Sequence, residues 1–205
     1  MISKPAALGF RVHSGWATAI VLAGPVDAPT VVFRERLELA NAAFPGSHEP
    51  FHFVELMSMS EASAIIARCW KQSFELAVDA VANTKQAVAQ KGFRVTTCAI
   101  LQGRITEMPD LEKILAAHPN FYQMAFTATG ILFREVLMIA AEASDIRVIR
   151  PFEWNLEEKA PDLLGLAPWD LSDRLTQMGE PWGSPWTIDQ KYAACAAWVA
   201  LMKRV

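Results

Sequence analysis

Two apolar runs separated by a short polar turn occupy residues 7–24, and they restrict the possible folds of this chain more than any other feature. The stretch reads ALGFRVHSGWATAIVLAG. Apolar side chains alternate with small or polar ones in the first run: Leu8, Phe10 and Val12 against Gly9, Arg11 and His13. This is the period of a β-strand, and the second run, from Trp16 to Ala23, is typical of a strand covered on both faces. His13-Ser14-Gly15 predicts a tight turn, so we expect a β-hairpin.

A third strand and a long helix are predicted next. Residues 30–39 have the pattern of a half-exposed edge strand with Val31, Phe33 and Leu37 on its apolar face, although Glu35 falls on that face too. The segment 41–56 has the composition of a loop. Ser58 and Glu61 match a capping box, and apolar residues at helical spacing continue as far as Gly92. A helix of this length rises about 1.5 Å per residue, so part of it should project beyond the sheet.

Four further elements are predicted before residue 150. They are a strand at 93–101, a short helix at 111–117, a long helix at 121–143 and a strand at 146–149. Gly130 lies in the middle of the second long helix. We expect it to kink that helix or to mark the place where two helices meet.

The composition changes after about residue 160. Five of the seven tryptophans lie between Trp154 and Trp198, and Pro-Trp occurs three times. This stretch is predicted to be an irregular arm whose tryptophans anchor it by packing, because each buries a large area. The alternative is an aromatic cage for a ligand, formed by Trp154, Trp169, Trp182 and Trp186.

The closing helix, from about Thr187 to Lys203, is apolar over most of its circumference. A helix that lies on one surface needs only an apolar stripe, so this one should be covered from two sides. The core domain supplies one cover. For the other we favour a second subunit in a homodimer, since large apolar patches are rare on monomers. The alternative is that the arm from Pro161 to Trp186 folds back over the helix within one chain.

Composition and charge restrict the partners and the compartment. The net charge is −3 and Lys and Arg do not cluster, which makes nucleic acid an unlikely partner. No stretch approaches the roughly 20 apolar residues that span a bilayer, and the start, MISKPAALGF, lacks the apolar core of a signal peptide. A cytoplasmic protein without a membrane partner is therefore expected. Cys69, Cys98 and Cys195 lie far apart in apolar segments and are predicted to be buried free thiols.

The order of elements, βββαβααβα, resembles the ribonuclease H-like fold, which ribonuclease H, Holliday-junction resolvases and the half-domains of actin and sugar kinases share. The resemblance covers about residues 6–160 and concerns topology. It implies an α/β domain with a mixed five-stranded sheet in the order 3-2-1-4-5, flanked by helices. The crossover rules favour parallel pairing of the fourth and fifth strands with the first. We expect a domain at 1–160, followed by an arm and helix at 161–205.

The same resemblance implies where a nuclease would hold its metal, and this chain departs from that pattern. Nucleases of the fold place an Asp in the middle of the first strand, where this chain has Arg11. A cation there repels a divalent metal. Glu61 matches the acid of the long helix, but residues 102–104, Gln-Gly-Arg, offer none at the end of the fourth strand. The last acid would come from a late helix, with candidates Glu153, Glu157 and Glu158. We therefore predict no metal near residue 11 and no cofactor.

A binding crevice is still expected beyond the carboxyl ends of the parallel strands, where ligands bind α/β sheets. The candidate residues are Arg11, His13, Ser14, Glu61, Gln102, Arg104 and His118. Two arginines, a histidine and turn amides suit an anion such as a phosphate or carboxylate. The alternative is structural, with Arg11 paired to a carboxylate, Glu35 or Glu153, and with His13 capping the turn.

Two functions follow from these residues. The first is a non-nucleolytic ribonuclease H-like module that binds a small anionic ligand or only a partner subunit. The second is an enzyme that acts on a phosphoester or nucleotide through an atypical site around Arg11, His13 and Glu61. The missing acids of the first and fourth strands favour the first function.

Overall fold

Five strands form one mixed sheet in the computed structural model, which describes residues 3–203. The strands are β1 (Lys4–His13), β2 (Trp16–Ala23), β3 (Thr30–Glu38), β4 (Phe93–Ile100) and β5 (Arg147–Ile149). Their order across the sheet is β3-β2-β1-β4-β5. β1 pairs antiparallel with β2 and parallel with β4, and β4 pairs parallel with β5. The predicted order and strand directions are confirmed.

Helices occupy most of the remaining chain. They are α1 (Pro50–Phe53), α2 (Met59–Gln90), α3 (Leu111–Leu115), α4 (Phe121–Ala143), α5 (Leu156–Leu164), α6 (Asp170–Gly179) and α7 (Ile188–Met202), with single 3₁₀ turns η1 (Glu153–Asn155) and η2 (Glu180–Trp182). Part of the predicted loop 41–56 is thus helical. α5 runs through residue 160, and the division of the chain into two domains there stays a prediction.

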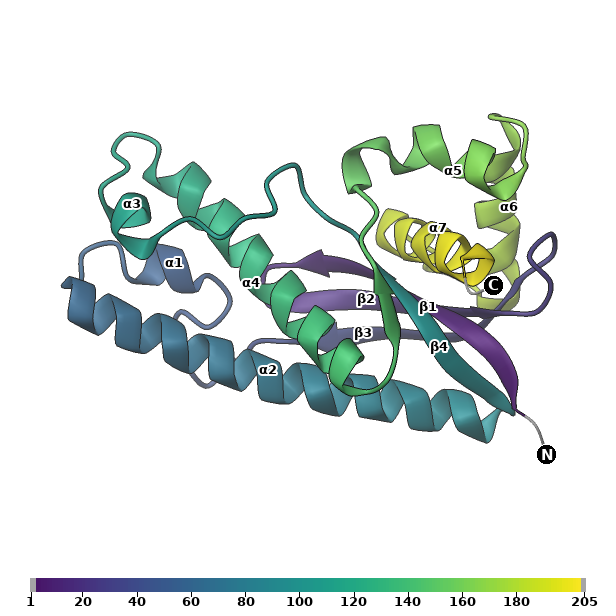
Figure 1. The fold of residues 1–205 in the computed structure, drawn as a ribbon, viewed down its shortest axis with the longest axis horizontal. Helices are drawn as coiled ribbons and strands as arrows, with labels where there is room; N and C mark the ends of the chain where they lie inside the picture. Colours follow the sequence, from purple (N-terminus) through teal and green to yellow (C-terminus); the bar gives the residue numbers. More distant parts are fainter. Residues whose placement is uncertain (1–2, 204–205) are drawn as a thin grey trace.

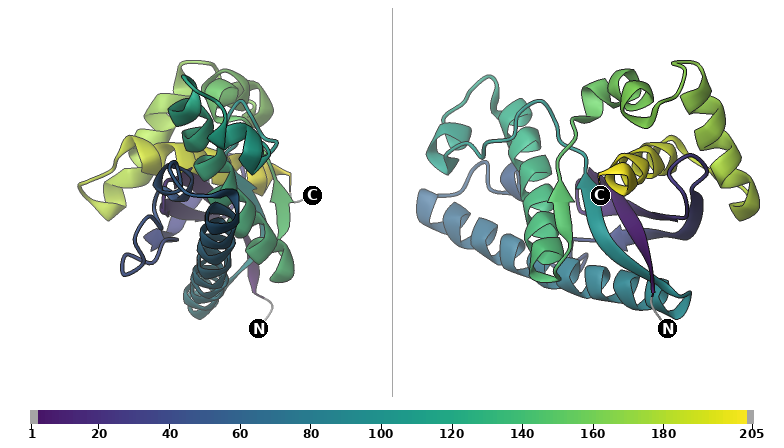
Figure 2. Two further views of the ribbon diagram at one scale, coloured as in Figure 1. Left: turned by 90° about the vertical axis from the view of Figure 1, so that its left-hand side faces the viewer. Right: turned by 45° about the vertical axis from the view of Figure 1, so that its right-hand side comes forward.

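The sheet separates two apolar cores. α2 and α4 cover one face, and α7 covers the other with α5 and α6 outside it (Figures 1 and 2). The alternation of β1 sends its side chains into both cores. Leu8 and Phe10 belong to the core under α2 and α4, whereas Ala7 belongs to the core under α7. β1 is therefore central and buried on both faces, as the hairpin pattern predicted.

The capping box predicted at the start of α2 is present. The Ser58 side chain accepts a hydrogen bond from the backbone N–H of Glu61, and the Glu61 carboxylate accepts from the backbone N–H of Ser58 at 3.0 Å. The 32 residues of α2 span about 48 Å. Its N-terminal part projects beyond the sheet, alongside α1 and α3 (Figure 1). The predicted overhang of this helix is thus observed.

From Ala193 to Leu201, α7 is buried on all sides within a single chain. Every residue from Ala193 to Leu201 is at most 2% exposed. The sheet covers one side of the helix, and α5 and α6 pack against it from the other. The arm therefore supplies the second cover, which was the alternative to a second subunit. The homodimer stays a prediction, but the apolar surface of α7 no longer supports it, because that surface is already covered within one chain.

The five tryptophans between Trp154 and Trp198 do not all act as packing anchors. Trp198 is fully buried and donates from Nε1 to the Val26 carbonyl oxygen at 2.6 Å. Trp182 and Trp186 are half-buried and donate to backbone carbonyls of Val31 and Leu175. Trp154 and Trp169 are 54% and 77% exposed, so for these two the prediction of packing anchors is wrong.

The predicted faces of β3 are wrong, because the strand contains a bulge. Val31 pairs with Leu22, but Phe33 pairs with the adjacent Val21, so the register shifts between them. Val31 therefore packs with the core under α7, whereas Phe33 packs with the other core. The two do not share a face. Glu35, which broke the sequence pattern, is exposed.

α4 is a single helix from Phe121 to Ala143, so two helices do not meet at Gly130. It is also the one helix among residues 3–203 that is long and apolar enough to cross a membrane, which the sequence analysis overlooked. Of its most apolar window, 56% is buried in the molecule. It packs against α2 and the sheet as a core helix. The cytoplasmic location stays a prediction.

All three cysteines are free and buried, as predicted. Burial raises the pKa of the Cys69 thiol to about 11, and those of Cys98 and Cys195 to about 12. The reactive thiolate is then scarce, about one molecule in a thousand or fewer at pH 8. We expect a thiol reagent such as dithiobis(nitrobenzoate) to leave the native chain unmodified for hours and to modify three thiols at once in denaturant. Rapid modification of any one cysteine in the native chain would contradict this assignment.

Candidate anion-binding crevice

A crevice of about 700 Å³ opens at the carboxyl ends of β1 and β4, where the sequence placed one. This volume is within the range of ligand sites. The turn after β1, the segment after β4 and one face of α4 line it. The charged and polar lining residues include Arg11, His13, Ser14, Arg104, Arg134 and Glu153.

Four of the seven candidate residues meet in this crevice, namely Arg11, His13, Ser14 and Arg104. The other three do not line it. The Gln102 side chain is buried and donates to the Ile100 carbonyl oxygen at 3.1 Å. Glu61 is fully committed to the cap of α2, and His118 is exposed and stacks on Phe121.

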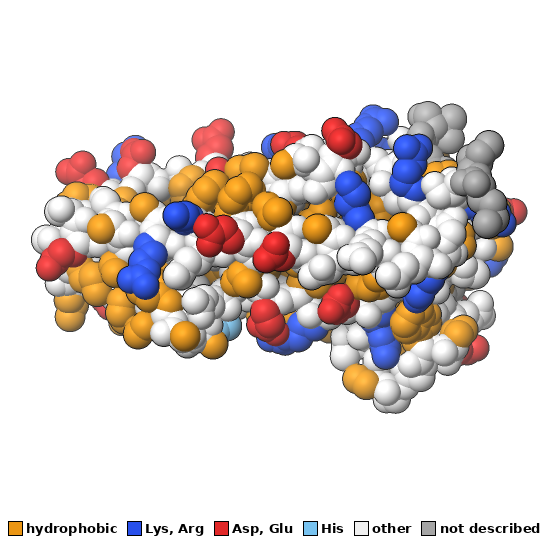
Figure 3. Space-filling model, turned by 90° about the horizontal axis from the view of Figure 1, so that it is seen from below, with side chains coloured by type: hydrophobic (Ala, Val, Ile, Leu, Met, Phe, Trp, Pro, Cys, Tyr) orange, Lys and Arg blue, Asp and Glu red, His pale blue; other side chains and the backbone are white. Residues whose placement is uncertain are grey.

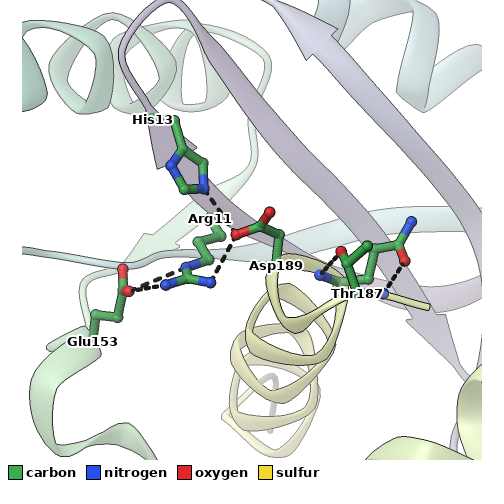
Figure 4. Close-up of polar contacts among 6 residues, drawn as sticks. Arg11, His13, Glu153, Thr187 and Asp189 are labelled. Carbon is green, nitrogen blue, oxygen red and sulfur yellow. Dashed lines mark hydrogen bonds and ion pairs between the residues drawn. The ribbon is translucent and has the colours of Figure 1, made fainter. Parts of the chain in front are cut away.

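Arg11 is held between two carboxylates. Its Nε and Nη2 donate to Glu153 Oε1 at 3.1 and 2.7 Å, and its Nη1 donates to Asp189 Oδ1 at 2.7 Å (Figure 4). The Tyr192 ring lies 4.6 Å from the guanidinium carbon in a cation–π contact. The structural alternative of the sequence analysis named Glu153, and this pairing is present. Glu35 is not a partner, and Asp189 was missed.

His13 is held by the same aspartate and by an aromatic ring. Its Nε2 lies 2.9 Å from Asp189 Oδ1, and its ring stacks on Trp16 with 4.2 Å between centroids. An ionised carboxylate only accepts hydrogen bonds, so Nε2 carries the hydrogen in this contact. His13 therefore contacts α7 rather than capping its own turn.

Gly9 explains why α7 reaches the end of β1. A Cβ atom at Gly9 would overlap the Ala193 carbonyl oxygen and lie 2.5 Å from the Ala197 backbone nitrogen. Only the absence of a side chain lets the helix approach so closely. Asp189 lies one turn before Ala193, and Arg11 lies two residues after Gly9 on the same face of β1. The close approach at Gly9 thereby brings the carboxylate and the guanidinium together.

The position of Asp189 was visible in the sequence through a signal that was not used. Thr187 and Gln190 form a capping box, with the Thr187 N–H donating to Gln190 Oε1 at 2.7 Å (Figure 4). This motif marks the start of the helix and places Asp189 in its first turn. The sequence analysis expected an acid from a late helix near the end of β1, and the helix that supplies one is α7, through Asp189. Glu153, from the predicted set, belongs to η1 and reaches the same guanidinium.

Arg134 of α4 is the second residue that the sequence analysis missed. Its Nε donates to the Leu101 carbonyl oxygen at 3.0 Å, just after β4. Its terminal nitrogens have no hydrogen-bond partner among residues 3–203. A Cβ atom at Gly130 would lie 2.7 Å from Arg134 Nη1, so this glycine makes room for the guanidinium. The pair Gly130 and Arg134, four residues apart on one helix face, was the available signal.

Burial lowers the pKa of the Arg134 guanidinium from its ordinary value, while the nearby charge of Glu153 acts in the opposite direction. Arginine nevertheless stays protonated at neutral pH. Arg134 is therefore a half-buried cation with free N–H groups in the crevice. Such a group suits an anionic oxygen, which would replace the lost water contacts.

Exposed aromatic rings lie beside these charges. Phe126 lines the crevice and is 61% exposed. Trp154 is 54% exposed, and the guanidinium carbon of Arg104 lies 4.8 Å from its ring centroid. On the other side, the Arg36 guanidinium carbon lies 3.8 Å from the Trp16 ring. The crevice thus combines cations with aromatic faces.

The residues present do not suit the divalent metal that the nucleases of this fold use. Among residues 3–203 no group of three or more His, Cys, Asp or Glu side chains is placed to hold a metal ion. The two carboxylates that converge on the end of β1 both bind Arg11. A guanidinium between them repels a second cation.

Comparisons with known proteins agree with the fold. No family model matches the chain, and no curated protein matches it. A solved structure of Thermus thermophilus RuvC in complex with a Holliday junction substrate matches with a TM-score of 0.54 and 9% identity, covering 95% of this chain and 91% of that one. A second Thermus thermophilus RuvC structure matches with a TM-score of 0.49 and 10% identity, covering 96% and 93%. At this identity the likeness concerns the fold alone, and it agrees with the strand order: the chain has a ribonuclease H-like fold.

Proposed function

We propose that this chain is a non-nucleolytic ribonuclease H-like module whose crevice binds a phosphate-bearing anion. The observation that carries the proposal is Arg134, which presents unpaired guanidinium N–H groups to the crevice. Three arginines, at 11, 104 and 134, face two carboxylates there, so the local charge is positive although the whole chain carries −3. A phosphate oxygen would accept from Arg134 directly.

Arg11 contributes less to this binding than its position suggests. Both of its terminal nitrogens already donate to carboxylates. The cationic and turn groups that are left to meet a ligand include Arg134, Arg104 and the turn at Ser14. We therefore assign the phosphate to the side of the crevice formed by α4 and the segment after β4.

A nucleic-acid strand is a specific candidate for the ligand. The RuvC structure of similar fold holds a Holliday junction substrate, and this likeness does not support the expectation that nucleic acid is an unlikely partner. That expectation used the net charge, which averages over the whole surface. The face on which α2 lies does mix acidic and basic side chains (Figure 3), whereas the crevice gathers arginines. Exposed Phe126 and Trp154 offer faces on which bases would stack.

The proposal predicts that Arg134→Met weakens binding of a fluorescent single-stranded oligonucleotide by about tenfold or more, because one charge-assisted hydrogen bond is lost. Fluorescence anisotropy at several salt concentrations measures this. The slope of log K against log salt should fall by about 0.7 for the lost phosphate contact. Competition with inorganic phosphate and with a mononucleotide separates a small-anion site from a strand site.

Arg94→Met is the matched control for this experiment. Arg94 is an exposed arginine at the start of β4, at the opposite end of that strand from the crevice. Arg94→Met removes the same charge as Arg134→Met, but at a place far from the crevice. It should therefore leave the affinity for the oligonucleotide nearly unchanged. Equal losses in the two variants would mean that only net charge matters and would contradict a site in the crevice. Circular dichroism checks that both variants fold.

A phosphoester-cleaving enzyme is the second candidate, and the contact between His13 and Asp189 favours it. A histidine oriented by a carboxylate is a common general base. Glu61 cannot belong to this site, because its carboxylate caps α2. The remaining set would be His13 with Arg134. Metal-independent release of phosphate or nucleotide that disappears in His13→Gln would support the enzyme over the binding module.

A further inference from the structure

Two carboxylates from distant parts of the chain converge on one guanidinium at the end of β1. Glu153 belongs to η1 and Asp189 to the first turn of α7, and each has an oxygen 2.7 Å from a nitrogen of Arg11. The three side chains are 17 to 27% exposed. Figure 4 shows Arg11 between the two acids. The interactions are therefore partly shielded from water.

Without a cation these two carboxylates would repel each other in a half-buried site. Carboxylate oxygens are also the ligands that Mg²⁺ and Mn²⁺ prefer. A cation between Glu153 and Asp189 therefore stabilises this arrangement by offsetting the repulsion between the two carboxylates. In this chain the cation is covalently attached, and it cannot lose its proton or dissociate.

We infer that the guanidinium of Arg11 is a permanent internal cation that replaces a divalent metal between Glu153 and Asp189. The inference rests on the proposed function in one respect, which is that the crevice does not cleave through a metal. It adds a role for Arg11: this residue positions η1 and the start of α7 rather than binding the ligand. The cation–π contact with Tyr192 holds the guanidinium in place.

Removal of the internal cation leaves Glu153 and Asp189 free to bind an external one. Arg11→Asp adds a third carboxylate in the same place. We expect it to bind Mn²⁺ on the order of 100-fold more tightly than the wild-type chain, whose affinity should be weaker than about 1 mM.

Electron paramagnetic resonance of free Mn²⁺ and calorimetry measure this binding. Arg94→Asp makes the same change of charge at an exposed site far from the crevice and should bind no more Mn²⁺ than the wild type. Combining Arg11→Asp with Asp189→Asn should remove most of the gained affinity. Circular dichroism reports whether each variant folds. If Arg11→Asp does not fold, the neutral Arg11→Met replaces it, with a smaller gain expected.

Two results would overturn the inference. One is stoichiometric Mn²⁺ binding by the wild-type chain that Asp189→Asn removes. The other is a folded Arg11→Asp chain that binds no more Mn²⁺ than Arg94→Asp, or a folded Arg11→Met chain that binds no more than Arg94→Met. Binding of an oligonucleotide through Arg134 is a separate measurement without metal. Its failure would overturn the proposed ligand and leave the role of Arg11 standing.

Discussion

Gly9→Ala should lower the melting temperature by about 10 °C or more, which corresponds to a loss of about 4 kcal/mol in the free energy of unfolding for a chain of this size. The added methyl group would overlap the Ala193 carbonyl oxygen and lie 2.5 Å from the Ala197 backbone nitrogen. Both are backbone atoms of α7, so no side-chain rotation relieves the contact. The helix must move away from the sheet, and the core beneath it loses its packing.

Gly103→Ala is the matched control. The same methyl group there would lie 3.8 Å from the nearest atoms, those of the Arg134 guanidinium, which is an ordinary contact. Neither glycine has a positive φ, so the two substitutions differ in space and not in backbone strain. Thermal unfolding followed by circular dichroism compares them. Similar melting temperatures for Gly9→Ala and the wild type would show that α7 does not dock as the structure has it.

The contact at Gly9 also shows which parts of the fold the sequence could predict. Strand and helix periods are local, so the hairpin, α2 and α4 followed from short windows, whereas the order of the sheet followed from the resemblance of the element order to a known fold. The docking of α7 on β1 is not local. It joins residues more than 170 positions apart, and the sequence pattern showed only that α7 needed two covers.

The same difference between local and long-range contacts explains which residues of the candidate site were predicted and which were missed. Arg11, His13, Ser14 and Arg104 were found because they end strands whose order was predictable. Asp189 was missed because its position depends on how α7 docks. Arg134 was missed because it lies within an apolar helix that was interpreted as core, and Gly130 was interpreted as a kink or as the junction of two helices. Exposed Trp154 and Trp169 show that residue type alone does not predict packing.

Incubation of the wild-type chain with a four-way DNA junction or a single strand in Mg²⁺ or Mn²⁺ should give no metal-dependent cleavage. A divalent metal assists such cleavage by activating water and by stabilising the leaving oxygen. Here Arg11 occupies the position between the Glu153 and Asp189 carboxylates. At the end of β4 the chain has the amide of Gln102 in place of an acid, and this amide donates to the Ile100 carbonyl oxygen. Enzymes accelerate reactions by about a million-fold or more, so the difference from an active nuclease is very large.

A gel assay of labelled DNA measures cleavage, and an anisotropy reading in the same buffer shows whether the strand is bound. Bound and uncut DNA is the expected result. Asp189→Asn is the variant that identifies a true signal, because it removes a carboxylate that any metal at the end of β1 would need. Metal-dependent cleavage by the wild type that Asp189→Asn abolishes would refute a non-nucleolytic module. Cleavage equal in both comes from a contaminant, since a reaction in this crevice must respond to the loss of the charge that orients Arg11 and His13.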